Sequence, residues 1–145
     1  MSAPAYPESR YAPAQPVNLA SKDERARLSG SALKAFFRLV SRWGLRDEDA
    51  KQLLGGVTNG PYYEMKKHPD RRVLDPDTLL RISYLAGIFK ALNVLHSQPL
   101  ADEWVSLPNS NRIFGGGTPL MYMIRGGLPA MSVVRRLLDA RQVGL

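Results

Sequence analysis

One apolar stripe between residues 75 and 96 constrains the fold more than any other feature of the chain. Asp75 precedes Pro76, the order of a helix cap and a first helical residue, and Asp77 suits the positive end of a helix dipole. Beyond these residues, apolar side chains recur at intervals of three and four, which is the helical period. The stripe consists of Leu79, Ile82, Leu85, Ala86, Phe89 and Leu92, and Leu80, Ile88 and Leu95 widen it. We predict a heavily buried helix that ends near His96, is the longest of the chain and forms the centre of the fold.

The rest of the chain also has helical spacing, without the sustained alternation of apolar and polar residues that is typical of strands. A first helix carries apolar residues from Leu33 to Trp43. Ser29 or Ser31 can cap its start, and Gly44 can end it in a left-handed turn. Further helices are predicted at about 47–54, 61–67, 99–105, 118–125 and 129–140. The sequence therefore predicts an all-α fold.

Composition divides the chain into three parts. Residues 1–28 form a tail rich in proline and alanine, which we expect to be disordered up to about Ser21, while residues 22–28 can extend the first helix. Residues 29–97 contain the long helix and most of the positive charge. Residues 98–145 form a smaller helical part that ends in a short tail.

Charge and composition exclude several classes of protein. The 145 residues carry a net charge of +7, which favours an acidic or nucleic-acid partner. The chain has no cysteine and two histidines, so disulfides, thiolate metal sites and a histidine-rich metal site are not expected. We expect no apolar run that approaches the roughly 20 residues of a membrane helix, and no apolar signal core is present at the N-terminus. We therefore expect a cytoplasmic protein without metal or cofactor.

Two motifs resemble enzyme sites superficially. Asp47, Glu48 and Asp49 form an acidic run, but a helix N-terminus, where Asp47 caps, explains the run better than paired catalytic carboxylates. The sequence from Gly115 to Thr118 lacks the lysine that a phosphate-binding loop needs before its threonine. The chain is therefore not expected to be an enzyme.

Two short predicted helices, 47–54 and 61–67, are joined by a glycine-rich turn, which is the layout of a helix-turn-helix motif. Lysine and arginine side chains near the second helix can pair with phosphates, and tyrosine hydroxyls can contact phosphates or base edges. The alternative is that these are solvated charges after a short core helix. The candidate DNA-binding residues are Thr58, Asn59, Tyr62, Tyr63, Lys66, Lys67, Arg71 and Arg72.

The C-terminal third is rich in glycine, and Met121, Met123 and Met131 lie close together in it. Methionine adapts to irregular surfaces and is common at interfaces, although these side chains can equally form a core against the long helix. Residues 142–145 follow a helix and end in a free carboxylate. A tail of this kind can enter the cleft of a partner.

Over about residues 30–142, several uncommon residues occur in the same order as in one family of proteins. In the first half these are Trp43-Gly44-Leu45, Ala50, Leu53-Leu54-Gly55, Leu74, Asp77-Thr78-Leu79, Arg81-Ile82-Ser83 and the run from Ile88 to Leu92. In the second half they are Trp104, Pro108-Asn109, Phe114-Gly115, Thr118-Pro119-Leu120, Gly126-Gly127 and the run from Val134 to Leu138. The chain resembles the Xre/MbcA/ParS-like antitoxins, especially the Xre partner of RES-domain toxins.

This resemblance implies an antitoxin of a type II toxin–antitoxin system. Its C-terminal part is expected to bind and block an NAD-consuming RES-type toxin. Its helix-turn-helix part is expected to bind operator DNA as a homodimer and to repress its own operon. Two alternatives remain open, a stand-alone helix-turn-helix regulator and an antitoxin of an ADP-ribosylating ParT-type toxin.

The same resemblance places the toxin-binding surface in the C-terminal part. Arginines there can pair with acidic residues of the toxin, and the Leu145 carboxylate or Asp139 can bind donors in an NAD pocket. The alternative is that the arginines lie on the solvated face of the last helix. The candidate toxin-binding residues are Phe114, Arg125, Arg135, Arg136, Arg141, Gln142, Val143, Gly144 and Leu145.

Overall fold

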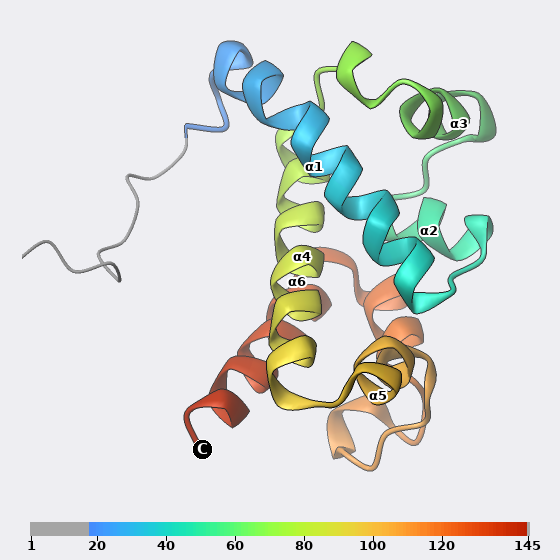
Figure 1. The fold of residues 1–145 in the computed structure, drawn as a ribbon, viewed down its shortest axis with the longest axis vertical. Helices are drawn as coiled ribbons and strands as arrows, with labels where there is room; N and C mark the ends of the chain where they lie inside the picture. The colour runs from blue at the N-terminus through green and yellow to red at the C-terminus, as the bar shows by residue number, and fades with distance from the viewer. Residues whose placement is uncertain (1–17, 145) are drawn as a thin grey trace, which may run out of the picture.

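The computed structural model describes residues 18–144, and every regular element among them is a helix (Figure 1). The all-α prediction is confirmed. The α-helices are α1 (Lys22–Trp43), α2 (Asp47–Leu53), α3 (Asn59–Lys67), α4 (Pro76–Leu95), α5 (Gln98–Glu103) and α6 (Pro119–Gln142). Three short 3-10 helices are η1 (Pro69–Arg71), η2 (Trp104–Ser106) and η3 (Arg112–Phe114).

Helix α4 lies at the centre of the fold, as predicted, with α1 packed on one side and α6 on another (Figure 1). Asp75 caps it, since one carboxylate oxygen accepts from the Thr78 amide at 2.7 Å, and Pro76 is its first residue. The prediction that it is the longest helix is wrong. It has 20 residues, whereas α1 has 22 and α6 has 24, because α1 starts early and α6 continues through a kink.

By length and composition alone, α4 could cross a membrane, with a mean hydropathy of 1.3 over its most apolar window. In this fold the helix contributes to the core. Leu85, Ile88 and Leu92 are fully buried and belong to the same core cluster as side chains of α1 and α6. This environment is typical of a core helix.

Residues 22–28 extend α1, as predicted, but the cap of the helix differs from the prediction. Ser21 is the cap, and its hydroxyl accepts from the Glu24 amide at 3.3 Å. Ser29, predicted as a possible cap, is instead buried within the helix, where its hydroxyl donates to the Arg25 carbonyl and accepts from the Leu74 amide at 2.9 Å. Ser31 is also inside the helix. The end of α1 is as predicted, because Gly44 adopts the left-handed conformation at φ 64°.

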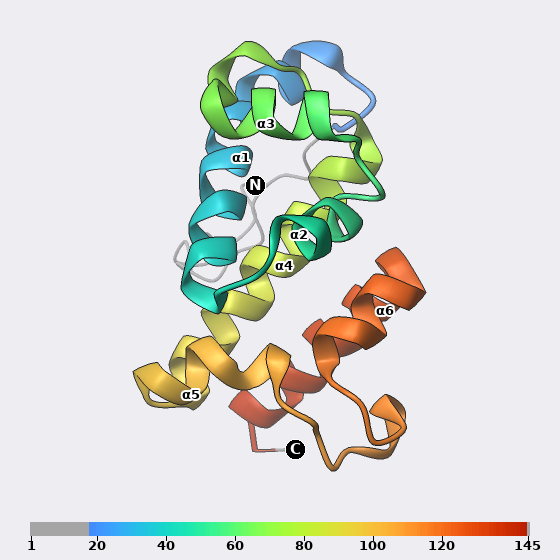
Figure 2. The same cartoon turned by 90° about the vertical axis from the view of Figure 1, so that its right-hand side faces the viewer.

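The helix-turn-helix part and the C-terminal part share one core. Buried side chains of α1, α2, α3, α4 and α6 belong to a single cluster, and the most extensive contact between elements is that of α4 with α6. Figure 2 shows α2 and α3 beside α1 and α4, with the loop before α6 lying at the opposite end of the molecule from α3. Helix α4 thus belongs to the helix-turn-helix part and also packs against the C-terminal part.

Helix α6 consists of two segments that meet at Gly127. Thr118 caps the first segment by accepting from the Met121 amide at 3.2 Å, as predicted from Thr118-Pro119. Gly127 has φ 65° and ψ −145°, a conformation that side chains other than glycine rarely adopt. The predicted interruption at Gly126-Gly127 is therefore present as a kink, and Pro129 lies in the first turn of the second segment.

Candidate functional site

The first candidate surface consists of α2, the turn that follows it, α3 and η1. The turn contains Gly55 and Gly56, both at positive φ, and leads to Thr58 at the cap position of α3. Thr58 and Asn59 are exposed at the start of α3, where a helix-turn-helix protein approaches DNA. Asn59 is not free, because its side-chain oxygen accepts from the Lys51 ammonium on α2.

Asp47 organises this surface, although the sequence predicted it to be a cap. The cap position of α2 is Arg46, which makes no side-chain capping bond. One oxygen of the Asp47 carboxylate accepts from the Tyr62 hydroxyl at 2.7 Å and from the Lys66 ammonium at 3.3 Å. The other oxygen accepts from the Tyr63 hydroxyl at 3.3 Å. Asp47 therefore connects the start of α2 to three of the predicted DNA-binding residues.

Tyr62 is wrongly predicted as a DNA contact. Its side chain is fully buried, its ring lies 5.5 Å from the ring of Phe37 on α1, and its hydroxyl is taken up by Asp47. Tyr63, in contrast, is 48% exposed. The helical spacing places these adjacent tyrosines on different faces of α3, one towards the core and one towards solvent.

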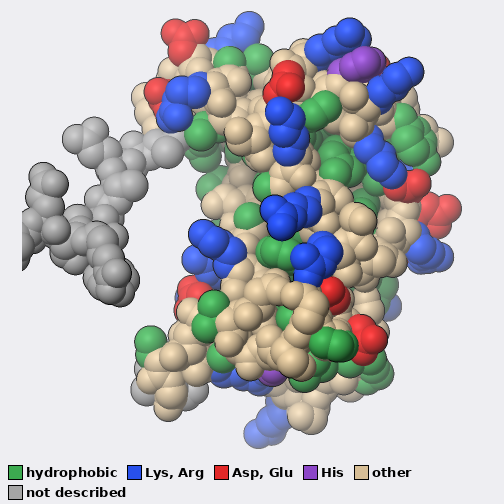
Figure 3. Space-filling view, in the orientation of Figure 1, with side chains coloured by type: hydrophobic (Ala, Val, Ile, Leu, Met, Phe, Trp, Pro, Cys, Tyr) green, Lys and Arg blue, Asp and Glu red, His purple; other side chains and the backbone are tan. Residues whose placement is uncertain are grey.

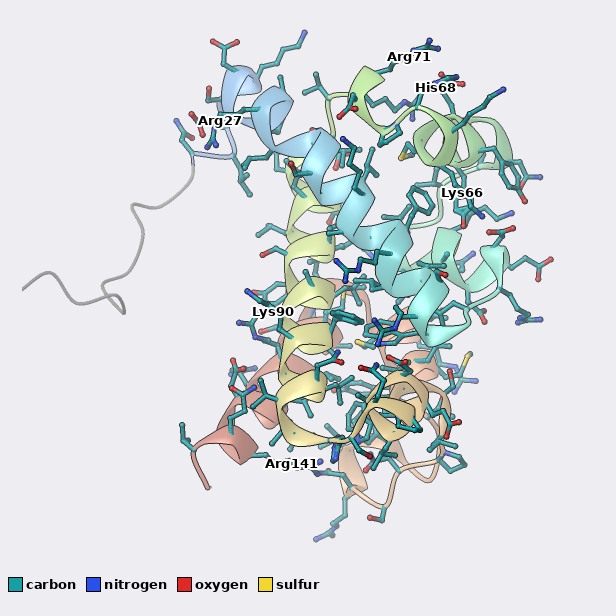
Figure 4. All side chains as sticks on the ribbon, viewed as in Figure 1. Arg27, Lys66, His68, Arg71, Lys90 and Arg141 are labelled. Carbon is teal, nitrogen blue, oxygen red and sulfur yellow. The ribbon has the colours of Figure 1, made fainter. Side chains whose placement is uncertain are left out.

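The remaining predicted DNA-binding residues gather at the end of α3. Lys66 lies there with His68 and Arg71, and Figure 3 shows basic side chains beside a histidine at this end (Figures 3 and 4). Lys67 is exposed, and Arg72 is half-buried. Arg71 forms an ion pair with Glu64 at 3.8 Å, so two of the four lysine and arginine side chains at this end are already paired with acidic residues. This end can bind phosphates, while base reading by α3 depends on its exposed start.

The Asp47 cluster predicts an acid dependence of stability. The hydrogen bond from Tyr62 lowers the pKa of Asp47 below its ordinary value of 3.8, and Lys66 and Tyr63 act in the same direction. Burial, together with Asp47, raises the pKa of Tyr62. A carboxylate with a lowered pKa in the folded state stabilises the fold fully above its unfolded pKa.

We expect the free energy of unfolding to fall as the pH drops below about 4 and the folded Asp47 becomes protonated. Urea denaturation between pH 2.5 and 6 measures this dependence. In Asp47→Asn the decline should be shallower, with the matched Asp49→Asn serving as a control for general charge effects. An unchanged acid profile in Asp47→Asn would contradict the assigned role.

The second candidate surface lies beside the first segment of α6. Phe114 is buried, with its ring 6.2 Å from Trp104 and 5.3 Å from Tyr122 in edge-on contacts. It forms a wall of an open pocket of about 280 Å³ that Arg125 also lines. The structure thus brings together two of the predicted toxin-binding residues, Phe114 and Arg125, in one place. The aromatic ring of Phe114 supports the pocket and is not itself a free surface contact.

Arg135, on the second segment of α6, packs against α4. Its guanidinium lies over Gly87 of α4 so closely that a Cβ at residue 87 would overlap it. The Nε atom also donates to the Asp139 carboxylate, which lies one turn further along α6, at 3.1 Å. Because residue 87 has no side chain, the guanidinium can lie directly against α4. Arg135 therefore fastens α6 to α4.

The other predicted toxin-binding residues lie towards the C-terminus. Arg136, Arg141, Gln142, Val143 and Gly144 are exposed, while Leu145 lies outside the described residues. In Figure 4, Arg141 is at the opposite end of the molecule from Lys66 and Arg71. The kink at Gly127 separates these residues along α6 from Arg125, so the predicted set does not form one compact site.

Arg81 lies between the two candidate surfaces. Its position in the sequence did not mark it as a site residue. Its Nε atom donates to Asp77 at 2.7 Å, and another nitrogen donates to the Leu53 carbonyl at the end of α2 at 3.5 Å. Its guanidinium also lies close to Gly55 in the turn and to Gly127 at the kink. The turn of the helix-turn-helix part and the kink of α6 therefore share one side chain.

No group of three or more His, Asp or Glu residues within residues 18–144 is arranged to bind a metal ion. The two surfaces described above differ in chemistry, because one is suited to phosphates and the other is formed by apolar and basic side chains.

Comparison with known proteins identifies the family. A family model described as the antitoxin Xre-like helix-turn-helix domain matches residues 23–87. A protein of Sinorhizobium fredii, named uncharacterized protein y4oB, is 33% identical over 131 residues, which cover 90% of this chain and 98% of the relative. The chain belongs to the Xre-like antitoxin family. No solved structure matches it.

The matched region begins within α1 of this antitoxin and ends within α4. It includes α2, the glycine turn, α3 and the Asp47 cluster, so the predicted helix-turn-helix part is confirmed. The pocket beside α6 lies outside the matched region. The function of that pocket therefore has to be argued from its own residues.

Proposed function

We propose that this antitoxin binds and blocks an NAD-consuming RES-type toxin through its C-terminal part and represses its own operon through its helix-turn-helix part. The observation that carries the proposal is the second surface of Phe114, Arg125 and neighbouring residues, which lies outside the Xre-like region. The resemblance of residues 104–138 to the toxin-binding domain of Xre partners of RES toxins supports this assignment. The protein acts by binding and not by catalysis, in the cytoplasm.

Operator binding is supported by the charges around α3. Thr58 and Tyr63 are exposed on α3, and Lys67 and Arg72 lie near the basic end without an ion pair in the described part of the chain. Lysine and arginine contacts to phosphates provide affinity, while the exposed start of α3 provides base contacts. Asp47 offsets the charge of Lys66, so we assign Lys66 to the support of the surface.

The homodimer is proposed to form through an apolar groove between α1 and α4. The groove has a volume of about 550 Å³, and no charged residue lines it. Small side chains such as Ala35 and Ser83 form its hollow, while Leu80 protrudes from its edge at 39% exposure. A surface with both a hollow and a protruding leucine complements a second copy of itself about a two-fold axis. Such a dimer matches a palindromic operator.

Leu80→Glu is expected to convert the dimer to a monomer, because a carboxylate then enters the apolar groove of the second copy. Size-exclusion chromatography with light scattering measures the mass of the antitoxin alone. Val94→Glu is the matched control, since Val94 lies on the same helix, outside the groove, and is 73% exposed. A monomeric wild type, or a Leu80→Glu variant that stays dimeric, would contradict this interface.

Toxin neutralisation is tested in cells. Expression of the neighbouring reading frame alone should stop growth and lower the cellular NAD content, and co-expression of this antitoxin should restore both. Growth arrest without loss of NAD, relieved by the antitoxin, would replace the RES-type partner with an ADP-ribosylating toxin. A harmless neighbouring product would instead favour a stand-alone helix-turn-helix regulator.

A further inference from the structure

We propose that the pocket beside the first segment of α6 binds a carboxylate-bearing segment of the toxin, with Arg125 pairing the carboxylate and Met121 packing against apolar residues around it. The inference rests on the proposed function and specifies where and by which chemistry the partner docks. It assigns the docking site to the first segment of α6 and not to the second segment or the C-terminal tail.

The pocket combines an aromatic floor with polar groups at its edge. The rings of Phe114 and Tyr122 meet edge-on at 5.3 Å, and Gly117 and Gly126 also line the pocket. The Tyr122 hydroxyl and the Arg125 guanidinium make no hydrogen bond to any residue between 18 and 144. Both groups can therefore donate to an oxygen acceptor that enters the pocket.

The charged residues close to the pocket in the sequence are of one sign. No acidic residue occurs between Glu103 and Asp139, and the four charged residues in that interval are arginines. Two of them, Arg112 and Arg125, are exposed, and neither forms an ion pair in the described part of the chain. A partner segment with Asp or Glu side chains is complementary to this surface, whereas a basic segment is repelled.

Exposed apolar side chains favour a protein partner over a nucleic acid. Met121 is 38% exposed at the pocket, Ile113 is 40% exposed on η3, and Leu107 is 41% exposed at the start of the adjacent loop. Phosphate-binding surfaces are dominated by polar and charged groups, while the centre of a protein interface is apolar and enriched in methionine, aromatic residues and arginine. The pocket has the composition of such a centre.

The second segment of α6 lacks a comparable arrangement. Arg135 is held over Gly87 and paired with Asp139, so it cannot reach a partner without giving up its packing on α4. Arg136 is exposed and lines neither the pocket beside the first segment of α6 nor the groove between α1 and α4. Arg136 therefore provides a control of equal charge on the same helix.

Binding of the purified product of the neighbouring reading frame to the full-length antitoxin tests the proposal by titration calorimetry. Arg125→Glu and Met121→Asp are each expected to weaken binding by about 10-fold or more, because they introduce a negative charge opposite a carboxylate. Arg136→Glu should change the affinity by no more than about 2-fold. Melting temperatures within a few degrees of wild type confirm that the exposed substitutions leave the fold intact.

The outcomes distinguish a wrong docking site from a wrong antitoxin function. If the wild type binds and Arg125→Glu and Met121→Asp bind equally well, the docking site is wrong while the antitoxin function stands. If Arg125→Glu weakens binding to operator DNA but not to the neighbouring product, the surface serves a nucleic acid and the inference is overturned. If the wild type does not bind the neighbouring product, the proposed function and this inference both fail.

Discussion

Replacement of Gly127 by alanine is expected to destabilise the protein by about 1–3 kcal/mol and to abolish partner binding. At φ 65° and ψ −145°, residue 127 occupies backbone space that is close to exclusive to glycine. A Cβ there would make an ordinary contact with the Arg81 guanidinium at 3.4 Å, so the cost comes from the backbone conformation. The kink of α6 therefore has to change, which moves the first segment with Arg125 relative to the second segment packed on α4.

Thermal unfolding and titration with the product of the neighbouring reading frame measure the two effects of Gly127→Ala. Gly60→Ala is the matched control, because a Cβ at residue 60 meets no atom within 4 Å and the residue lies in helix α3 at ordinary φ. Alanine there should leave stability unchanged or raise it by about 0.5–1 kcal/mol. Wild-type stability and binding in Gly127→Ala would show that the kink is not needed.

Replacement of Tyr62 by alanine is expected to cost about 3–5 kcal/mol of folding free energy, which can unfold a domain of this size. The side chain is fully buried, contacts Phe37 and donates to Asp47. Tyr62→Phe retains the ring but leaves the carboxylate without that donor, at an expected cost of about 1–2 kcal/mol. Urea denaturation at pH 7 measures both losses.

The adjacent Tyr63 provides the control for this prediction. It is 48% exposed, and we expect Tyr63→Ala to cost less than about 1 kcal/mol. Operator affinity should be lowered by Tyr63→Ala but not by Tyr62→Phe, because only Tyr63 faces solvent. Equal losses of stability in Tyr62→Ala and Tyr63→Ala, or a loss of operator affinity in a stably folded Tyr62→Phe, would contradict the placement of Tyr62 in the core.

Local signals in the sequence predicted the helices and several of their ends. Asp75-Pro76 and Thr118-Pro119 mark helix starts, and Gly44 marks an end, because capping and left-handed turns depend on residues close in sequence. The extension of the first helix over residues 22–28 was predicted, but its cap was not, because residues 22–27 are mostly charged and carry no apolar stripe. The Ser21 and Glu24 pair has the spacing of a capping box, a signal that could have located this start.

Contacts between distant residues were not predictable from local spacing. Asp47 meets Tyr62 because α2 and α3 pack together across the turn, so a residue that looks like a cap becomes the centre of a hydrogen-bond cluster. Arg135 looks like a free surface charge, and only the packing of α6 on α4 places it over Gly87. Phe114 and Arg125 line one pocket, and that pocket depends on the fold of the preceding loop, which local spacing does not reveal.

The mass of the complex formed on co-expression tests the central claim most directly, namely that this antitoxin binds the product of the neighbouring reading frame. Both proteins are expressed together and purified through a tag on the neighbour, and the product is analysed by size-exclusion chromatography with light scattering. We predict that the two proteins elute together with a mass above that of either alone, and that the neighbour is toxic when this chain is omitted. Separate elution of the two proteins, beside a neighbour that is harmless by itself, would contradict the account.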